Sequence, residues 1–100
     1  MGFVQIIEFE TDNIDGVRAV GKEWEATSTG KRSASRRILA EDHDRPGTYL
    51  MIVEFPSYEK AMANSNLPET QKFSGLMMEA AGNPARFRNL DVVEIIDLEG

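Results

Sequence analysis

Four stretches of the chain carry apolar residues at strand-like spacing. The first, Phe3 to Phe9, is rich in β-branched residues and predicts a strand. The second, Ser33 to Asp42, has mixed polarity, which favours the edge of a sheet. The third, Tyr49 to Phe55, is apolar on both faces, which indicates a strand covered on both sides. A last strand is predicted from Phe87 to Leu98.

Two other stretches carry apolar residues at helical spacing. Between Asp12 and Gly30 these residues recur every three or four positions as far as Trp24, which predicts an amphipathic helix. Another helix is predicted from Ser57, a suitable N-cap residue, to about Asn64. Asn66-Leu-Pro-Glu69 has the character of a fresh helix start, and Gly82-Asn-Pro84 ends that helix. The second helix is therefore predicted to be interrupted.

The order β-α-β-β-α-β predicts an α+β, ferredoxin-like fold in a single domain over residues 1–100, with two helices on one face of a four-stranded antiparallel sheet. The first and third strands lie at the centre of that topology. The other sheet face would carry one of two apolar sets: Val4, Ile6, Leu50, Ile52, Val92 and Ile96, or their alternates Phe3, Ile7, Met51, Val53, Val93 and Ile95. Because monomers rarely expose such a patch, we expect a homodimer whose sheets pack face to face. The last strand is a second candidate contact.

Composition and charge narrow the classes of partner. With 41% apolar and 28% charged residues the chain has the composition of a soluble globular protein. Its net charge of -6 repels polyphosphate and anionic lipid, so we expect no nucleic-acid partner and no membrane association. The absence of cysteine excludes disulfides and thiolate metal sites. The first apolar run is too short for a signal peptide, and we expect a cytoplasmic protein.

Three features of the chain point to one known superfamily: the order of elements, the segment Tyr49-Leu-Met-Ile-Val-Glu-Phe-Pro-Ser-Tyr-Glu-Lys-Ala-Met62 and the final Asn89-Leu-Asp-Val-Val-Glu94. In these features the chain resembles the dimeric α+β barrel superfamily, in its antibiotic-biosynthesis-monooxygenase-like branch. The resemblance implies a pocket between helices and sheet, used in different members for cofactor-free oxygenation of polycyclic phenols, haem degradation, cyclisation or isomerisation. Haem-degrading relatives use a histidine on the second helix and an asparagine on the first strand. Here Tyr58 to Ala81 has no histidine and the first strand has Gln5, so we expect no cofactor.

We therefore expect a homodimer that binds a small organic molecule. The hypothesis is a cofactor-independent monooxygenase acting on an aromatic or polyketide-like substrate. Two alternatives stay open: a non-catalytic dimeric binding or structural module, and a cyclase or isomerase using the same pocket.

Three residues are candidates for catalysis. Asn64 and Asn66 lie at the break in the second helix, where an amide could hold an oxyanion or dioxygen. The alternative is that Asn66 caps the following helix and Asn64 ends the preceding one. Tyr49 offers a hydroxyl on the third strand that could assist proton transfer.

The candidates for ligand binding are aromatic, apolar and cationic: Trp24, Arg36, Arg37, Phe73 and Met77. Trp24 could stack on a flat ligand or simply fill the core. Adjacent strand residues point to opposite faces, so only one of Arg36 and Arg37 can face the pocket. The single histidine, His43, is flanked by carboxylates in Glu41-Asp-His-Asp44, which favours a solvated loop over a metal site. No metal is expected.

Overall fold

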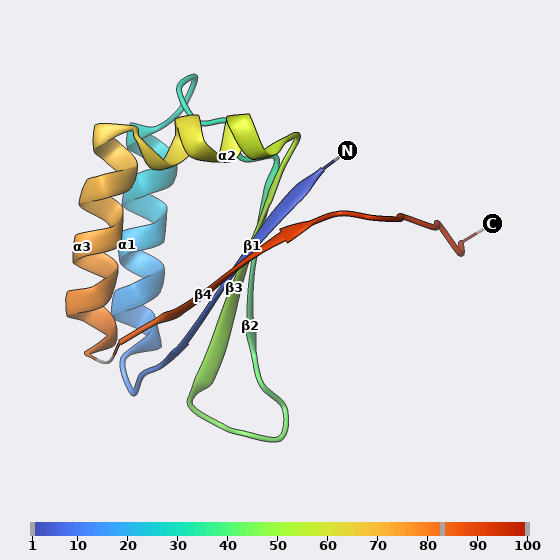
Figure 1. Ribbon diagram of the computed structural model, residues 1–100. Coiled ribbons are helices and arrows are strands. Elements are labelled where there is room, and N and C mark those ends of the chain that lie inside the picture. The colour runs from blue at the N-terminus through green and yellow to red at the C-terminus, as the bar shows by residue number, and fades with distance from the viewer. Residues whose placement is uncertain (1, 83, 100) are drawn as a thin grey trace.

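The computed structural model describes residues 2–82 and 84–99, and Asn83, which was predicted to help end the second helix, lies outside the described residues. Figure 1 shows helices packed on one side of a twisted sheet. The elements in chain order are β1 (Phe3–Glu10), α1 (Ile14–Thr27), β2 (Arg36–Glu41), β3 (Thr48–Phe55), α2 (Tyr58–Ser65), α3 (Pro68–Ala81) and β4 (Arg86–Asp91).

The four strands are all antiparallel and lie in the order β2-β3-β1-β4. The predicted ferredoxin-like fold is thus confirmed, with β1 and β3 at the centre of the sheet and the polar β2 at an edge. In the central register Ile7 of β1 stands between Met51 of β3 and Phe87 of β4. The two long helices α1 and α3 run side by side along the sheet, and α2 crosses one end of the layer (Figure 1).

Local hydrogen bonds and glycine set the helix ends. Asn13 caps α1 by accepting from the Gly16 N–H at 3.2 Å, and Ser57 caps α2 by accepting from Lys60 N–H at 3.2 Å. The predicted interruption is confirmed, because α3 begins anew at Pro68, without a side-chain cap. It ends at Gly82, whose φ of 78° lies in the left-handed region that glycine adopts without steric cost.

The strand alternation separates a core face from a bare face. On β1 and β3 the odd-numbered side chains face the helices, and most of them, among them Phe9 and Met51, are buried with Val17 of α1. Of the first predicted apolar set, the bare face carries Val4, Ile6, Leu50 and Ile52, whereas Val92 and Ile96 lie beyond the end of β4. We use the term bare face for the side of the sheet opposite the helices, whose apolar residues are Val4, Ile6, Ile38, Leu50, Ile52 and Leu90.

The prediction of a last strand reaching Leu98 is wrong, because β4 ends at Asp91. Asp91 pairs with Phe3, the first residue of β1, and the Val92 N–H donates to the Gly2 carbonyl at 2.9 Å. Beyond that point β1 offers no further residues to pair with. We call residues 92–99 the C-terminal tail, which leaves the sheet in Figure 1 and exposes most of its apolar side chains, with Leu98 91% exposed.

Candidate functional site

A small cavity between the helices and the sheet is the candidate site, and we call it the inner cavity. Its volume is about 150 Å³. Every helix and strand contributes to its lining, which consists of Gln5, Ile7, Trp24, Arg37, Met51, Val53, Phe55, Asn64, Ser65, Thr70, Phe73, Ser74 and Phe87. The wall is mainly aromatic and aliphatic, with a few polar groups, the usual composition of a small-molecule site.

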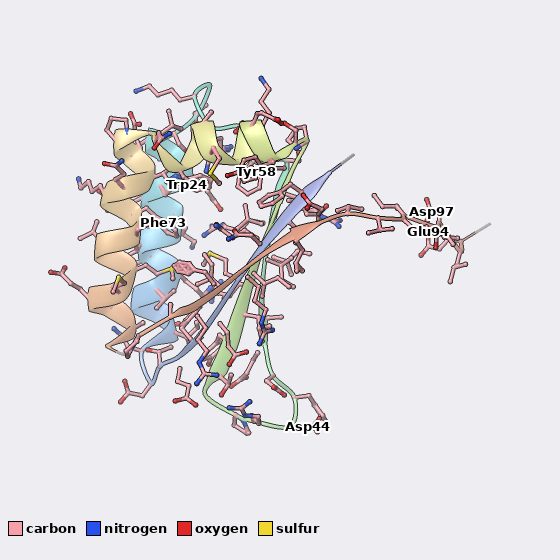
Figure 2. The ribbon with its side chains drawn as sticks, viewed as in Figure 1. Trp24, Asp44, Tyr58, Phe73, Glu94 and Asp97 are labelled. Atoms are coloured by element: carbon pink, nitrogen blue, oxygen red, sulfur yellow. The ribbon has the colours of Figure 1, made fainter. Side chains whose placement is uncertain are left out.

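Trp24 forms the wall of the inner cavity on the side of α1. It is buried, and its indole Nε1 donates to the Thr70 Oγ1 on α3 at 3.1 Å. Its ring meets that of Phe73 at a centroid distance of 5.7 Å (labelled in Figure 2). Trp24 and Phe73, both predicted to bind ligand, are thus brought together by the packing of α1 on α3.

Arg37 supplies the positive charge of the inner cavity. Its guanidinium lies 5.7 Å from the Trp24 ring centroid and pairs with the Glu25 carboxylate at 2.6 Å. The side chain is only 20% exposed. This close approach to α1 depends on Gly21, because a Cβ atom there would lie 2.5 Å from Arg37 Nη1. A planar guanidinium held in this way is suited to an anionic or partly anionic ligand oxygen.

Asn64 brings an amide to the inner cavity from the end of α2. The side chain is buried, and its Oδ1 accepts from the Ser33 N–H at 3.3 Å. That bond orients the amide, because the oxygen must face the backbone donor. The described residues offer no acceptor to its Nδ2, so this N–H₂ group can donate to a ligand.

Several polar residues of the inner cavity were not predicted from the sequence. The Gln5 amide donates to the Asn89 Oδ1 at 3.2 Å, from the middle of the otherwise apolar buried face of β1. A lone polar residue in such an apolar set was a usable signal. Thr70 and Ser74 are four residues apart on α3, so they share the helix face that bears Phe73.

The other candidates lie away from the inner cavity. Asn66 is exposed and is the C-cap residue of α2, so the alternative that it caps the following helix is wrong, because Leu67 is the N-cap residue of α3. Met77 is buried in the core. Arg36 pairs with Glu54 at 2.7 Å on the bare face, so the strand alternation assigns Arg37, and not Arg36, to the cavity. His43 is exposed in the turn between β2 and β3.

Tyr49 lies near the start of β3, two residues before Met51 of the cavity wall and on the same face of the strand. At about 3.4 Å per strand residue the two are roughly 7 Å apart, yet Tyr49 does not line the cavity. The Tyr49 ring stacks on Phe9 with a centroid distance of 5.9 Å. Burial and the neighbouring Glu41 carboxylate raise the pKa of the Tyr49 hydroxyl. Tyr49 is therefore a protonated hydrogen-bond donor at neutral pH, and it stands outside the cavity.

The raised pKa of Tyr49 can be measured by ultraviolet titration of a Tyr58→Phe variant, in which Tyr49 is the only tyrosine. Because the phenolate is the disfavoured form, the midpoint is expected above that of the same variant in denaturant. Glu41→Gln, which removes the neighbouring charge, is expected to lower the midpoint. Equal midpoints in the folded and unfolded protein would contradict the assignment.

Two kinds of site have no counterpart in the described part of the chain. Within residues 2–82 and 84–99, histidines and carboxylates do not gather in a group that could hold a metal ion. In the same residues each helix is too short or too polar to cross a membrane.

Comparison with known proteins identifies the fold. No family model matches the chain, and neither does any curated protein sequence. Solved structures do match: the chain has the fold of antibiotic biosynthesis monooxygenases. The predicted resemblance to the dimeric α+β barrel superfamily is confirmed at the level of the fold.

Three solved structures illustrate the likeness. Rv0793 from Mycobacterium tuberculosis is 14% identical and superimposes with a TM-score of 0.77 over 97% of this chain and 100% of its own. SnoaB, a cofactor-independent oxygenase from Streptomyces nogalater, is 9% identical with a TM-score of 0.77, over 95% and 96% of the two chains. An antibiotic biosynthesis monooxygenase is 18% identical with a TM-score of 0.71, over 94% of this chain and 100% of its own.

Proposed function

We propose that the chain acts as a homodimer that binds a flat hydroxylated aromatic molecule in the inner cavity and oxygenates it without a cofactor. The observation that carries the proposal is the placing of Arg37 and Asn64, a cation and an amide donor, against a wall formed by Trp24 and Phe73. The fold shared with SnoaB, a cofactor-independent oxygenase, supports the same reaction class.

The charges around the inner cavity favour an electron-rich ligand. Its lining contains one arginine and no carboxylate, histidine or tyrosine. The protein's contribution is therefore to stabilise the enolate or phenolate form of the ligand, while the proton leaves to water. Arg37 and the Asn64 Nδ2 would share the negative oxygen, which is the role of an oxyanion hole.

An anthrone illustrates the reaction in balanced form. Its enolate transfers one electron to dioxygen, and the resulting carbon radical and superoxide combine to form a C–O bond. Protonation gives a hydroperoxide at the former methylene carbon, which loses water as the O–O bond breaks and a carbonyl forms. One anthrone and one dioxygen thus give one quinone and one water, and no external reductant is needed.

Replacing Asn64 by alanine is the direct test of the proposal. Oxygen uptake with 1,8-dihydroxyanthrone is expected to fall by about 100-fold, because removal of one oxyanion donor typically costs about 10²- to 10³-fold in rate. Asn64→Asp keeps an acceptor for the Ser33 N–H but lacks the amide donor, so it should be equally slow.

The matched control is Asn66→Ala, the same change at an exposed amide outside the cavity, which should keep the full rate. Thermal unfolding of all variants separates lost chemistry from lost folding. If Asn64→Ala and Asn66→Ala keep equal rates, Asn64 has no part in the reaction. Uptake that is no faster with the wild-type protein than in buffer would favour the non-catalytic module.

The homodimer is proposed from the bare face. Its apolar centre, which includes Ile6 and Ile52, is flanked by the ion pairs Arg36–Glu54 at 2.7 Å and Arg88–Glu8 at 3.6 Å. An apolar centre within a charged rim is the usual anatomy of a protein interface. A second copy related by twofold symmetry would cover both faces at once, because each supplies the same patch.

A further inference from the structure

A second hollow lies on the outer side of the aromatic wall, and we call it the outer groove. It runs between α1 and α3 with a volume of about 430 Å³. Its lining is Val20, Glu23, Trp24, Thr27, Lys31, Pro68, Glu69, Lys72, Phe73 and Leu76. Trp24 and Phe73 line the inner cavity as well, so these two side chains separate one hollow from the other.

The volume of the inner cavity indicates that this cavity is only part of the binding site. Pockets for drug-sized ligands usually have volumes of about 300 to 1,000 Å³. The inner cavity, at about 150 Å³, is well below that range and suits a single ring. The outer groove falls within the range and is separated from the inner cavity by only two side chains.

The two members of the wall are held differently. Trp24 is fixed by the hydrogen bond to Thr70 and lies under two guanidinium groups, those of Arg32 at 5.6 Å and Arg37 at 5.7 Å. Phe73 has no polar anchor and is only half-buried. Rotation of the Phe73 side chain would therefore open the wall while Trp24 stays in place.

The outer groove has the chemistry of a site for fused rings with hydroxyl groups. The floor of the groove is apolar, and two ion pairs span it. Lys31, just after α1, pairs with Glu69 of α3 at 2.7 Å, and Glu23 of α1 pairs with Lys72 of α3 at 3.6 Å. The Glu69 Oε2 atom is buried and has no hydrogen-bond donor among the described residues. The hydrogen bond from Lys31 lowers the pKa of Glu69, so at neutral pH this oxygen is an unpaired acceptor.

We propose that the outer groove is a second chamber of the binding site, and that one polycyclic hydroxylated aromatic ligand spans both chambers when Phe73 moves aside. The reacting ring would lie in the inner cavity, and the remaining rings would lie in the outer groove with a hydroxyl directed to Glu69. This inference rests on the proposed function for the identity of the ligand.

The test is an anaerobic titration of the full chain with phenol, which has one ring, and with 1,8-dihydroxyanthrone, which has three. Trp24 is the only tryptophan of the chain and borders both chambers, so quenching of its fluorescence reports binding. Nitrogen in place of air keeps binding apart from oxygenation.

The deciding variant is Thr27→Phe, which fills the outer groove from an exposed position of α1. Its matched control is Thr29→Phe, since Thr29 is also exposed and also donates to a backbone carbonyl, yet does not line the groove. Thr27→Phe should weaken binding of the anthrone at least tenfold and change phenol binding less than twofold. Thr29→Phe should change neither. Phe73→Ala should speed association of the anthrone.

Equal anthrone affinity in Thr27→Phe and Thr29→Phe would overturn the two-chamber site, and so would an absence of quenching by the anthrone. Failure of the proposed function has a different signature. In that case the anaerobic binding pattern appears as described, but no oxygen is consumed when air is admitted.

Discussion

Replacing Ile52 with aspartate is expected to separate the proposed dimer into monomers. Ile52 lies at the centre of the bare face, between Ile6 of β1 and Ile38 of β2. An aspartate there would place an unpaired carboxylate in the apolar centre of the interface, at a cost of several kcal/mol for each copy. Twofold symmetry doubles the effect, and each 1.4 kcal/mol is about tenfold in affinity. We expect the dissociation constant of the dimer to rise at least ~1,000-fold.

Sedimentation velocity at micromolar concentration measures this change directly. The matched control is Gln71→Asp, which adds the same charge at an exposed position of α3, in the helical layer. The wild type and Gln71→Asp should sediment as dimers, and Ile52→Asp as a folded monomer. A wild-type monomer would show that the bare face needs no partner. A dimeric Ile52→Asp variant would show that the dimer interface lies elsewhere on the protein.

The C-terminal tail supports the same expectation from another part of the chain. Val93 and Ile95 are 84% and 81% exposed, although both are strongly apolar. Figure 2 shows the labelled acidic residues Glu94 and Asp97 on the segment that leaves the sheet. Apolar side chains this exposed are typical of a segment that another protein surface covers. In a dimer the partner would be the nearest such surface.

The fold was predictable because its signals are local. The break between α2 and α3 followed from Pro68, and the central position of β3 followed from its two apolar faces. The end of β4 is set by a signal that is not local. Its pairing stops at Asp91 because β1 begins at Phe3, a partner 88 positions earlier in the numbering that the composition of the last segment does not reveal. The segment 92–98, with five apolar residues, therefore had the composition of a strand.

The candidate site was predictable only in part, for a similar reason. Trp24 and Phe73 lay on apolar helical faces, so their meeting in one wall followed from amphipathic packing. The choice between Asn64 and Asn66 depended on the exact end of α2, which the sequence leaves uncertain by a residue or two. Gly21 gave no signal at all, because its importance arises from Arg37, a residue on another element.

Gly21→Ala is expected to weaken ligand binding by about 10- to 100-fold without destabilising the fold. The new Cβ would lie 2.5 Å from Arg37 Nη1, so the guanidinium must leave its place beside Glu25 and Trp24. Loss of hydrogen bonds from a charged group to the ligand typically costs about 1.5 to 3 kcal/mol. The displaced atoms are the end of a flexible side chain, so the fold itself loses little. Meanwhile α1 exchanges glycine for alanine, which favours a helix by about 0.5 to 1 kcal/mol.

The matched control for this prediction is Gly75→Ala on α3, where an added Cβ meets nothing within 4 Å. Both variants should keep or raise the melting temperature, because 1 kcal/mol corresponds to roughly 4 to 8 °C in a domain of this size. Only Gly21→Ala should lose affinity for 1,8-dihydroxyanthrone in the Trp24 fluorescence titration. A general effect of helix stiffening would appear in both variants. Full affinity in Gly21→Ala would mean that the ligand does not depend on where Arg37 is held, and the anionic-oxygen role of that residue would be lost.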